Sequence, residues 1–257
     1  MSPAPISRRM ALRLSALLAA GCGAPLHGEE EGNAVTGFAL LELFTSQGCN
    51  SCPSADQNLA RVRQLAQQRK LPIYTLSFHV DYWNYLGWED PFSDAAYSQR
   101  QRRYAEAFKS ERVYTPQMIV NGRVEFVGSN QATTDRAIQA GLQGRPTAKL
   151  AIAVAEKEGA VTVEWNAQNL AEQDAILFAL VQKEASRDVT AGENRGKKLA
   201  HVNVVRQLQA VPFPKATGDA KLQLPPEAQS ADYHVTALVQ SRVDQKIAAA
   251  TQAEFSS

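Results

Sequence analysis

The sequence predicts an α/β domain that carries a helical insertion and is followed by a smaller all-β, sandwich-like domain. Two cysteines separated by two residues, Cys49 and Cys52, stand between a strongly apolar segment and an amphipathic one. A second apolar segment follows, which gives the order strand, helix, strand. Beyond residue 147 the apolar runs are short and separated by turn residues, with no helical pattern of useful length. The 257 residues are enough for two domains of this kind.

The first predicted domain begins with a strand that is buried on both faces. Phe38–Phe44 is an almost unbroken apolar run, as expected where helices cover both sides of a sheet. A helix from Cys49 to about Lys70 follows, and Pro53 falls in its first turn, where a missing N–H costs little. Ile73–Val80 is the second strand, and the β–α–β order implies a parallel pair.

The rest of this domain is predicted as an inserted helix, a hairpin and a closing helix. The inserted helix begins near Ser93, and we interpret its arginines as a solvated face, with nucleic-acid binding as the minor alternative. Asn121-Gly122, between strands over 117–120 and 123–127, is a strong signal for a two-residue hairpin turn. A helix over 131–142 closes the domain. The arginines of the inserted helix are Arg100, Arg102 and Arg103.

Short apolar runs after residue 147 predict about seven strands of the all-β domain. The runs are Leu150–Ala155, Val161–Trp165, Ile176–Gln182, His201–Leu208, Leu222–Leu224, His234–Gln240 and Ile247–Ala250. We therefore place the first domain over residues 37–146 and the all-β domain over residues 147–257.

The composition excludes some classes of function. Hydrophobic residues make up 44% of the chain and charged residues 21%, which is typical of an ordinary globular protein. The net charge of +1 does not indicate the excess of positive charge that binding to nucleic acid or to an anionic membrane surface would require. No feature of the sequence implies a cofactor.

The N-terminus predicts export. Arg8 and Arg9 precede the apolar stretch Met10–Ala20, and small residues follow up to Cys22, which is the layout of a secretory signal. We interpret residues 1–22 as the signal and residues 23–36 as a tether, and expect a periplasmic or secreted protein. Cys22 lies where a bacterial lipoprotein carries its acylated cysteine. It is a candidate lipid anchor, and the alternative is that it is removed with the signal.

The remaining two cysteines form one Cys-x-x-Cys pair, and we predict a redox-active dithiol. A disulfide across two residues closes a very small loop and removes little unfolded-state entropy, so a purely structural role explains it poorly. Cys49 lies at the start of the predicted helix, where free N–H groups and the helix dipole favour a reactive thiolate. Cys52 lies one turn further, and we expect it to be the less exposed, resolving thiol.

Tyr114-Thr115-Pro116-Gln117 is the second element of the predicted site. In thioredoxin-like domains a cis-proline before a strand faces the dithiol and positions the substrate backbone. We therefore predict a thioredoxin-like domain with a cis Pro116, and expect Thr115 to help bind substrate. A trans proline at a strand start is the alternative.

Two further polar side chains are candidates for catalysis. Glu42 is the only charge in the first apolar strand, where a buried carboxylate would serve proton transfer; an edge-facing, solvated Glu42 is the alternative. His79 ends the second strand at the same sheet edge as Cys49. It would tune the thiolate, join the cysteines in binding a metal, or play a structural role.

A cluster of aromatic residues follows His79. These side chains would either line a groove for an unfolded polypeptide or pack as a cap, and we favour packing. The candidate substrate-binding members are Tyr82, Trp83 and Trp88.

Several motifs together resemble a known family. They are Leu43-Phe44-Thr45-Ser46-Gln47-Gly48-Cys49, Cys52-Pro53, Phe78-His79-Val80-Asp81-Tyr82-Trp83, Leu86-Gly87-Trp88, Arg100-Gln101, Tyr114-Thr115-Pro116-Gln117 and Val120-Asn121-Gly122. This set is similar to the bacterial secreted proteins grouped as domain of unknown function 1223, a family with a thioredoxin-like core. The resemblance continues more weakly through Asn194-Arg195-Gly196 and Asn203-Val204-Val205-Arg206. The resemblance implies a thioredoxin-like fold and a dithiol at Cys49 and Cys52, but it does not indicate a substrate.

These observations predict an exported thiol–disulfide oxidoreductase that acts on protein thiols and disulfides and needs an unidentified redox partner. One alternative is a protein that binds copper or another soft metal through the Cys-x-x-Cys pair and His79. The other is a redox-inactive thioredoxin-like binding module, for which poor thiol reactivity would be expected.

Overall fold

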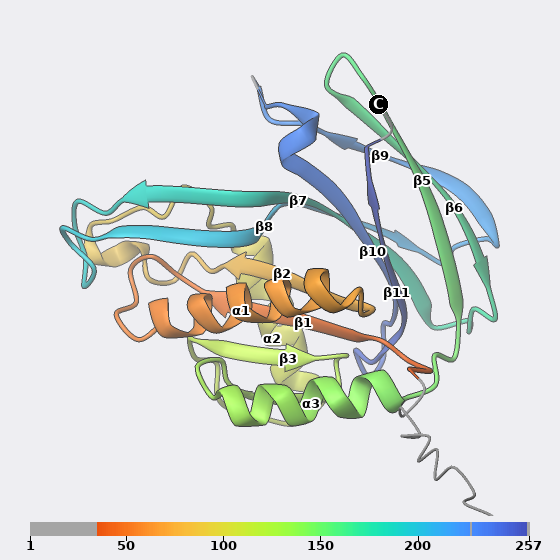
Figure 1. The fold of residues 1–257 in the computed structure, drawn as a ribbon, viewed down its shortest axis with the longest axis horizontal. Coiled ribbons are helices and arrows are strands. Elements are labelled where there is room, and N and C mark those ends of the chain that lie inside the picture. The colour runs from red at the N-terminus through yellow and green to blue at the C-terminus, as the bar shows by residue number, and fades with distance from the viewer. Residues whose placement is uncertain (1–34, 227, 256–257) are drawn as a thin grey trace, which may run out of the picture. The chain divides into compact units, whose positions relative to one another are not determined.

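Strands from both halves of the chain pair in one large β-sheet, which is the main element of the fold (Figure 1). The computed structural model describes residues 35–226 and 228–255, which lie in one compact unit. Within this part of the chain, strands take up 43% and helices 23%, with three α-helices. The predicted export signal and Cys22 lie outside the described residues.

The first half forms a strand–helix–strand unit and a hairpin. β1 (Ala39–Thr45) and β2 (Ile73–His79) are parallel, and α1 (Pro53–Arg69) connects them. β3 (Gln117–Val120) pairs antiparallel with the other side of β1, and β4 (Val124–Val127) pairs with β3. The strand predictions are confirmed to within one residue at each end.

β1 is buried along its whole length, as its apolar run predicts. Leu41 and Leu43 pack under α1 in one hydrophobic cluster. Leu40 and Phe44, which alternate with them, point to the other face and pack in a second cluster. The two faces of the sheet are therefore both covered, and a charged residue on β1 has no route to water.

The other two helices begin at side-chain caps. α2 (Ala95–Phe108) follows Asp94, whose carboxylate accepts a hydrogen bond from the backbone N–H of Ala96 at 2.8 Å. α3 (Gln131–Gln143) follows Asn130, which caps it in the same way. Two short 3-10 helices complete the described helical segments, Asn84–Leu86 and Ser230–Asp232.

In the described residues the second half supplies seven strands, and each predicted run coincides with one of them, although Leu224 falls one residue beyond its strand. Three form a separate antiparallel sheet in the order β5–β6–β9; they are β5 (Lys149–Lys157), β6 (Ala160–Gln168) and β9 (Thr217–Gln223). The other four join the large sheet; they are β7 (Asp174–Asp188), β8 (Lys198–Pro212), β10 (Tyr233–Ser241) and β11 (Ile247–Glu254).

The predicted fold class, an α/β thioredoxin-like domain followed by a smaller all-β domain, is wrong. The large sheet is mixed and has eight strands in the order β11–β10–β7–β8–β2–β1–β3–β4. β8 pairs in parallel with β2 at Ser77 and Val204, so strands from both halves share one sheet. The fold is mostly β-sheet rather than a helix-rich α/β domain. The order strand, helix, strand determines the β1–β2 pair, but it does not determine what pairs with the outer edge of β2.

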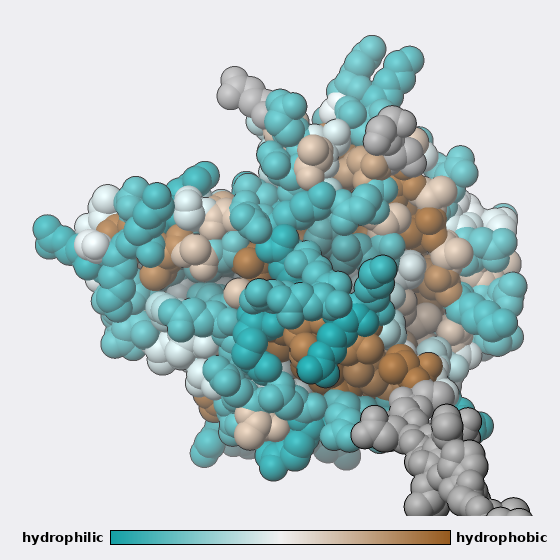
Figure 2. All heavy atoms as spheres, viewed as in Figure 1, coloured by the Kyte–Doolittle hydropathy of each residue, from teal (hydrophilic) through white to brown (hydrophobic). Residues whose placement is uncertain are grey.

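Three hydrophobic clusters hold the described residues together. One fills the space between the three-stranded sheet and β7, β10 and β11, and the other two lie on the two faces of the β1–β2 region. Figure 2 shows hydrophobic side chains also gathered at the surface between α1 and α3. The groove there is lined in part by Leu65, Leu71, Ile138 and Leu142. Among the described residues, none of the helices combines the length and apolar character needed to cross a membrane.

Candidate functional site

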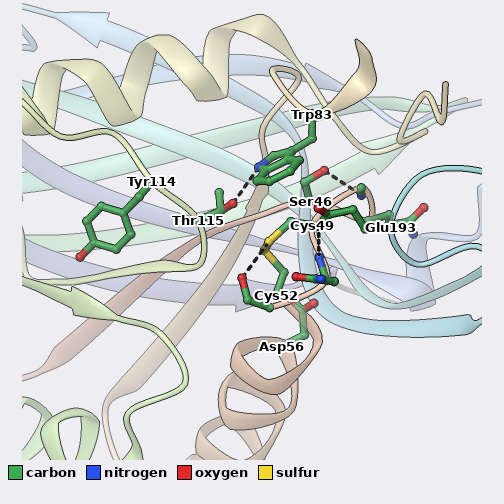
Figure 3. Close-up of a disulfide and its surroundings, with 12 residues drawn as sticks. Ser46, Cys49, Cys52, Asp56, Trp83, Tyr114, Thr115 and Glu193 are labelled. Carbon is green, nitrogen blue, oxygen red and sulfur yellow. Dashed lines mark hydrogen bonds between the residues drawn. A yellow bond between two sulfur atoms is a disulfide. The ribbon is translucent and has the colours of Figure 1, made fainter. Parts of the chain in front are cut away.

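The two cysteines lie between β1 and the first turn of α1 and are joined by a disulfide (Figure 3). Their Cα atoms are 5.5 Å apart. α1 begins at Pro53 with Cys52 as its N-cap residue, so the helix does not start at Cys49 as predicted. Cys49 lies in the preceding turn, where its N–H donates to the carbonyl of Ser46 at 3.2 Å. The loop of residues 46–52 is called the dithiol loop below.

Both sulfur-bearing residues are buried. Cys49 is 1% exposed and Cys52 0%, although Asn50 and Ser51 between them are exposed. The expected difference in exposure between the two cysteines is therefore negligible in this disulfide form. The hydroxyl of the exposed Ser51 lies 3.3 Å from the Cys49 sulfur.

Trp83 and Thr115 lie beside the disulfide on the side away from α1 (Figure 3). The indole Nε1 of Trp83 donates to the Thr115 hydroxyl at 2.8 Å. Gly48 allows the dithiol loop to approach Trp83 closely, because a Cβ at Gly48 would lie only 3.0 Å from the Cβ of Trp83. The Thr115–Pro116 peptide bond is cis, as predicted.

The tip of the β7–β8 hairpin holds the dithiol loop from the other side. The buried Asn194 amide donates to the carbonyls of Gln47 and Cys49 at 2.9 and 2.8 Å. The Glu193 carboxylate accepts from the backbone N–H of Asn50 at 2.9 Å. A segment from the predicted second domain thus fixes the loop that carries the cysteines, at the end of the sheet where α1 begins (Figure 1).

A buried polar network adjoins the dithiol loop, and His79 belongs to it. The Nδ1 atom of His79 lies 2.7 Å from the Asp90 carboxylate, which also accepts from the backbone N–H of Gln47 at 2.8 Å. Burial raises the pKa of Asp90, but the adjacent imidazole and the hydrogen bonds outweigh it and leave this pKa below its ordinary value. The ring of His201, from β8, packs edge-on against His79 with centroids 4.6 Å apart.

Glu42 lies on the opposite face of the large sheet from α1. Its carboxylate is 2.7 Å from Nε of Arg100 on α2 and accepts a short hydrogen bond from Tyr104. Arg100 is 1% exposed and also donates to Gln240 on β10 at 3.0 Å. Glu42 is buried, as one of its two predicted environments requires, but it is paired with Arg100. The solvated alternative for Glu42 is wrong, and so is the solvated face predicted for Arg100.

The aromatic candidates act as packing and hydrogen-bonding groups around the loop. The indole of Trp88 donates to the Gln47 side-chain carbonyl at 3.0 Å. Tyr82 donates to Gln101 at 3.1 Å, and burial raises its pKa to about 12. Tyr85 is 78% exposed and is free to contact a partner. The favoured interpretation as packing groups describes Tyr82, Trp83 and Trp88 in this structure.

No group of three His, Cys, Asp or Glu side chains with metal-binding geometry occurs in the part of the chain that the structure describes. His79, the third ligand of the soft-metal alternative, directs one ring nitrogen to Asp90. Its other ring nitrogen has no hydrogen-bond partner.

Sequence reasoning missed Asp56, His201 and Asn194, which all belong to this site. Asp56 lies four residues after Cys52, so the helical repeat was enough to place it on the same face of α1 as the dithiol. His201 and Asn194 come from the distant hairpin, and no spacing connects them to the cysteines. Asn194-Arg195-Gly196 is part of the motifs that resemble the family, but nothing in the sequence placed it near the cysteines.

A family model described as "Protein of unknown function (DUF1223)" matches residues 40–240. Among solved structures, a structural-genomics target from Agrobacterium tumefaciens is 29% identical, with a TM-score of 0.64 over 85% of this chain and 94% of that chain. A domain of the outer membrane lipoprotein Omp28 from Porphyromonas gingivalis is 7% identical with a TM-score of 0.28 and covers 42% of this chain and 88% of that one, which is too weak a similarity to indicate a shared fold. No curated protein matches the chain. Because the family model spans well over half of the sequence, the protein belongs to the DUF1223 family.

Proposed function

We propose that the protein is an exported thiol–disulfide oxidoreductase that exchanges disulfides with other exported proteins. The observation that carries the proposal is the Cys49–Cys52 disulfide at the N-terminus of α1. A bridge across two residues adds little to stability, so its value lies in its chemistry. The unpaired N–H groups and positive end of α1 favour the thiolate form of the reduced pair.

The reaction follows from the positions of the two sulfurs. The Cys49 thiolate attacks a sulfur of a substrate disulfide, and the far substrate sulfur leaves as a thiolate. Cys52 then attacks Cys49, which forms the disulfide seen in the structure and releases the second substrate sulfur. Two electrons pass from the dithiol to the substrate, and the reverse direction oxidises a substrate dithiol.

The burial of Cys49 adds a requirement to this proposal. A protein disulfide cannot reach a sulfur that is 1% exposed unless its cover opens. Trp83 and Thr115 lie beside the disulfide and belong to neither the dithiol loop nor the hairpin tip, so we assign them to the part of the cover that opens. In the proposed reaction Trp83 moves aside, and Thr115 and Pro116 then present their backbone to the substrate strand, with Tyr82 and Trp88 supporting the opened wall.

Glutathione titration of the Cys49–Cys52 pair under metal-free conditions tests the proposal. All variants carry Cys22→Ser, which removes the third cysteine of the sequence. We expect a reversible couple and catalysed reduction of an added protein disulfide, both lost in Cys49→Ser. A pair that binds Cu(I) and resists cycling with glutathione would instead support the soft-metal alternative. A pair that does neither would support the redox-inactive binding module.

A Trp83→Ala variant tests the opening step. In this variant a small thiol is expected to reduce the disulfide about tenfold faster, because displacing the indole no longer costs free energy. Tyr85→Ala is the matched control, because it removes an aromatic ring that is 78% exposed. Equal rates in the two variants would show that Trp83 is not the cover.

A further inference from the structure

Buried polar atoms without a hydrogen-bond partner are concentrated in elements that pack around α1. Eight such side-chain atoms occur among the described residues, and six of them belong to α1 and the neighbouring strands β1, β2 and β8. The six are Thr45 Oγ1, Asp56 Oδ1, Ser77 Oγ, His79 Nε2, His201 Nδ1 and Asn203 Oδ1. Most buried polar groups in proteins are paired, so this concentration calls for an explanation.

The hydrogen bonds around Gln47 determine which nitrogen of His201 carries its proton. The indole N–H of Trp88 is only a donor, so the Gln47 side chain must turn its carbonyl toward Trp88 and its NH2 toward His201. Nε2 of His201, 3.0 Å from that NH2, must therefore accept. The ring proton then lies on Nδ1, which faces the Asp56 carboxylate at 3.5 Å.

Asp56 itself lies one helical turn beyond Cys52. Cys52 has helical backbone angles and accepts a hydrogen bond from the backbone N–H of Asp56 at 3.1 Å, so the two side chains share one face of α1, with Cβ atoms about 5–6 Å apart. Figure 3 shows Asp56 on the α1 side of the disulfide. The carboxylate is 6% exposed, and its Oδ1 atom has no donor.

We propose that Asp56 is the proton acceptor of the Cys52 thiol and that His201 is the residue that positions it. This inference rests on the proposed oxidoreductase function and deepens it. The structure holds the oxidised pair, in which Cys52 has no proton to give. In the reduced pair the Cys52 S–H, one helical turn away on the same face of α1, supplies a donor for the unpaired oxygen, and the redox state then accounts for the missing partner of Asp56.

The proposed step balances in atoms and electrons. When Cys49 is joined to a substrate sulfur, the Cys52 thiol gives its proton to the Asp56 carboxylate and the resulting thiolate attacks Cys49. The bond between Cys49 and the substrate sulfur breaks, and the Cys49–Cys52 bond forms. The substrate leaves as a thiolate, and protonated Asp56 returns the proton to it, so a protein disulfide is the oxidant and no further reactant is needed.

Groups from several elements act on the charge of Asp56. His201 on β8 faces it directly, and His79 on β2, with its partner Asp90, packs against His201. The cations Arg187 on β7 and Arg206 on β8 lie over the Phe92 ring, which in turn contacts both imidazoles. The first turn of α1 also favours a negative charge at Asp56.

The test separates the two steps of thiol exchange. Reduced protein is mixed with oxidised glutathione, and the attack of Cys49 is distinguished from the intramolecular closure by Cys52, whose rate does not depend on glutathione concentration. We expect Asp56→Asn to slow closure about 100-fold near neutral pH and to move its pH midpoint upward, with the Cys49 step little changed. Asp135→Asn, an exposed carboxylate on α3 that pairs with Arg61 of α1, is the control and should behave as the wild type.

His201→Gln tests the positioning role. Closure should slow, because Asp56 loses the N–H that faces its carboxylate and positions it, and His201→Asn, which keeps an N–H near that place, should recover part of the lost rate. Closure rates and pH profiles of Asp56→Asn that match the wild type would overturn the inference.

A second measurement keeps this inference separate from the proposed function. In Cys49→Ser the remaining Cys52 thiol is titrated by its ultraviolet thiolate absorbance, with and without Asp56→Asn. A difference between the two titrations supports the contact of Asp56 with Cys52 even if the wild-type pair exchanges with no protein disulfide. Identical titrations refute it even if the wild type proves to be an active oxidoreductase.

Discussion

The Glu42 carboxylate and the Arg100 guanidinium form an ion pair 2.7 Å apart with 0% and 1% of the two side chains exposed. Burial lowers the pKa of Arg100, but the charge of Glu42 and the hydrogen bonds to Glu42 and Tyr104 outweigh it and leave this pKa above its ordinary value. Gln240 contacts both Arg100 and Tyr104, so the pair connects β1, α2 and β10. The pair thus joins elements from both halves of the chain.

Glu42→Gln is expected to lower the free energy of unfolding by about 3–5 kcal/mol, because it leaves a buried guanidinium without its counter-charge. Urea unfolding measures the loss. The double variant Glu42→Leu with Arg100→Met removes both charges and should be closer to the wild type than either single variant. A double variant that loses the sum of the two single losses would contradict the coupling.

Asn194→Ala is expected to loosen the dithiol loop, because it leaves the buried carbonyls of Gln47 and Cys49 without their donor. The unfolding free energy should fall by about 2 kcal/mol, and the disulfide should react faster with a small thiol. Asn166→Ala, at an exposed position of β6, is the control. Unchanged disulfide reactivity in Asn194→Ala would show that the hairpin tip does not restrain the loop.

Acid sensitivity is expected from His234. Burial, then the positive charges of Lys183 and Arg63, lower its pKa from 6.5 to about 3. The unfolded chain therefore binds a proton that the folded one does not, so stability is full above the unfolded pKa and falls as the pH drops toward the folded one, by up to about 1.4 kcal/mol per pH unit. Urea unfolding across this range should show a smaller slope for His234→Gln, and equal slopes would contradict the assignment.

Gly122→Ala is expected to be strongly destabilising, because a Cβ there would lie 2.1 Å from the carbonyl oxygen of Gln245 and φ is +61°. Gly196→Ala separates the two causes, since Gly196 has a φ of +83° but no atom within 4 Å of an added Cβ. We expect a loss of about 1–2 kcal/mol at Gly196 and at least about 2 kcal/mol more at Gly122. Equal losses would show that the turn yields to the clash.

Local signals in the sequence predicted local structure. Asn121 and Gly122 both have positive φ, as the predicted hairpin signal implies, although Val120 pairs with Val124 and the turn has three residues rather than two. β1 has the two buried faces that its apolar run indicates. The Cys49–Cys52 pair was likewise evident from its spacing alone, since the two residues are close in the chain. These features depend on neighbours within a few residues.

Long-range pairing was not predictable in the same way. The run that contains Val204 has the same alternation whether it pairs with β2 or lies in a separate sandwich, so the fold class could not be derived from it. Arginine is usually exposed, and the partner that buries Arg100 is 58 positions away. His201 had no spacing that linked it to the dithiol, and only the folded hairpin brings it there.

The lengths of β7 and β8 set a limit on how this chain can vary. Each has 15 residues, which at about 3.3 Å per residue span roughly 50 Å. One end of this ribbon packs Phe178 and Leu180 against the three-stranded sheet, and the other end reaches Cys49 through Asn194. Deleting one residue from β8 would turn the following side chains to the opposite face at one of these two places. Relatives should therefore tolerate insertions in exposed turns such as Glu158-Gly159, while the distance from His201 to the hydrophobic core at the far end of the ribbon stays constant.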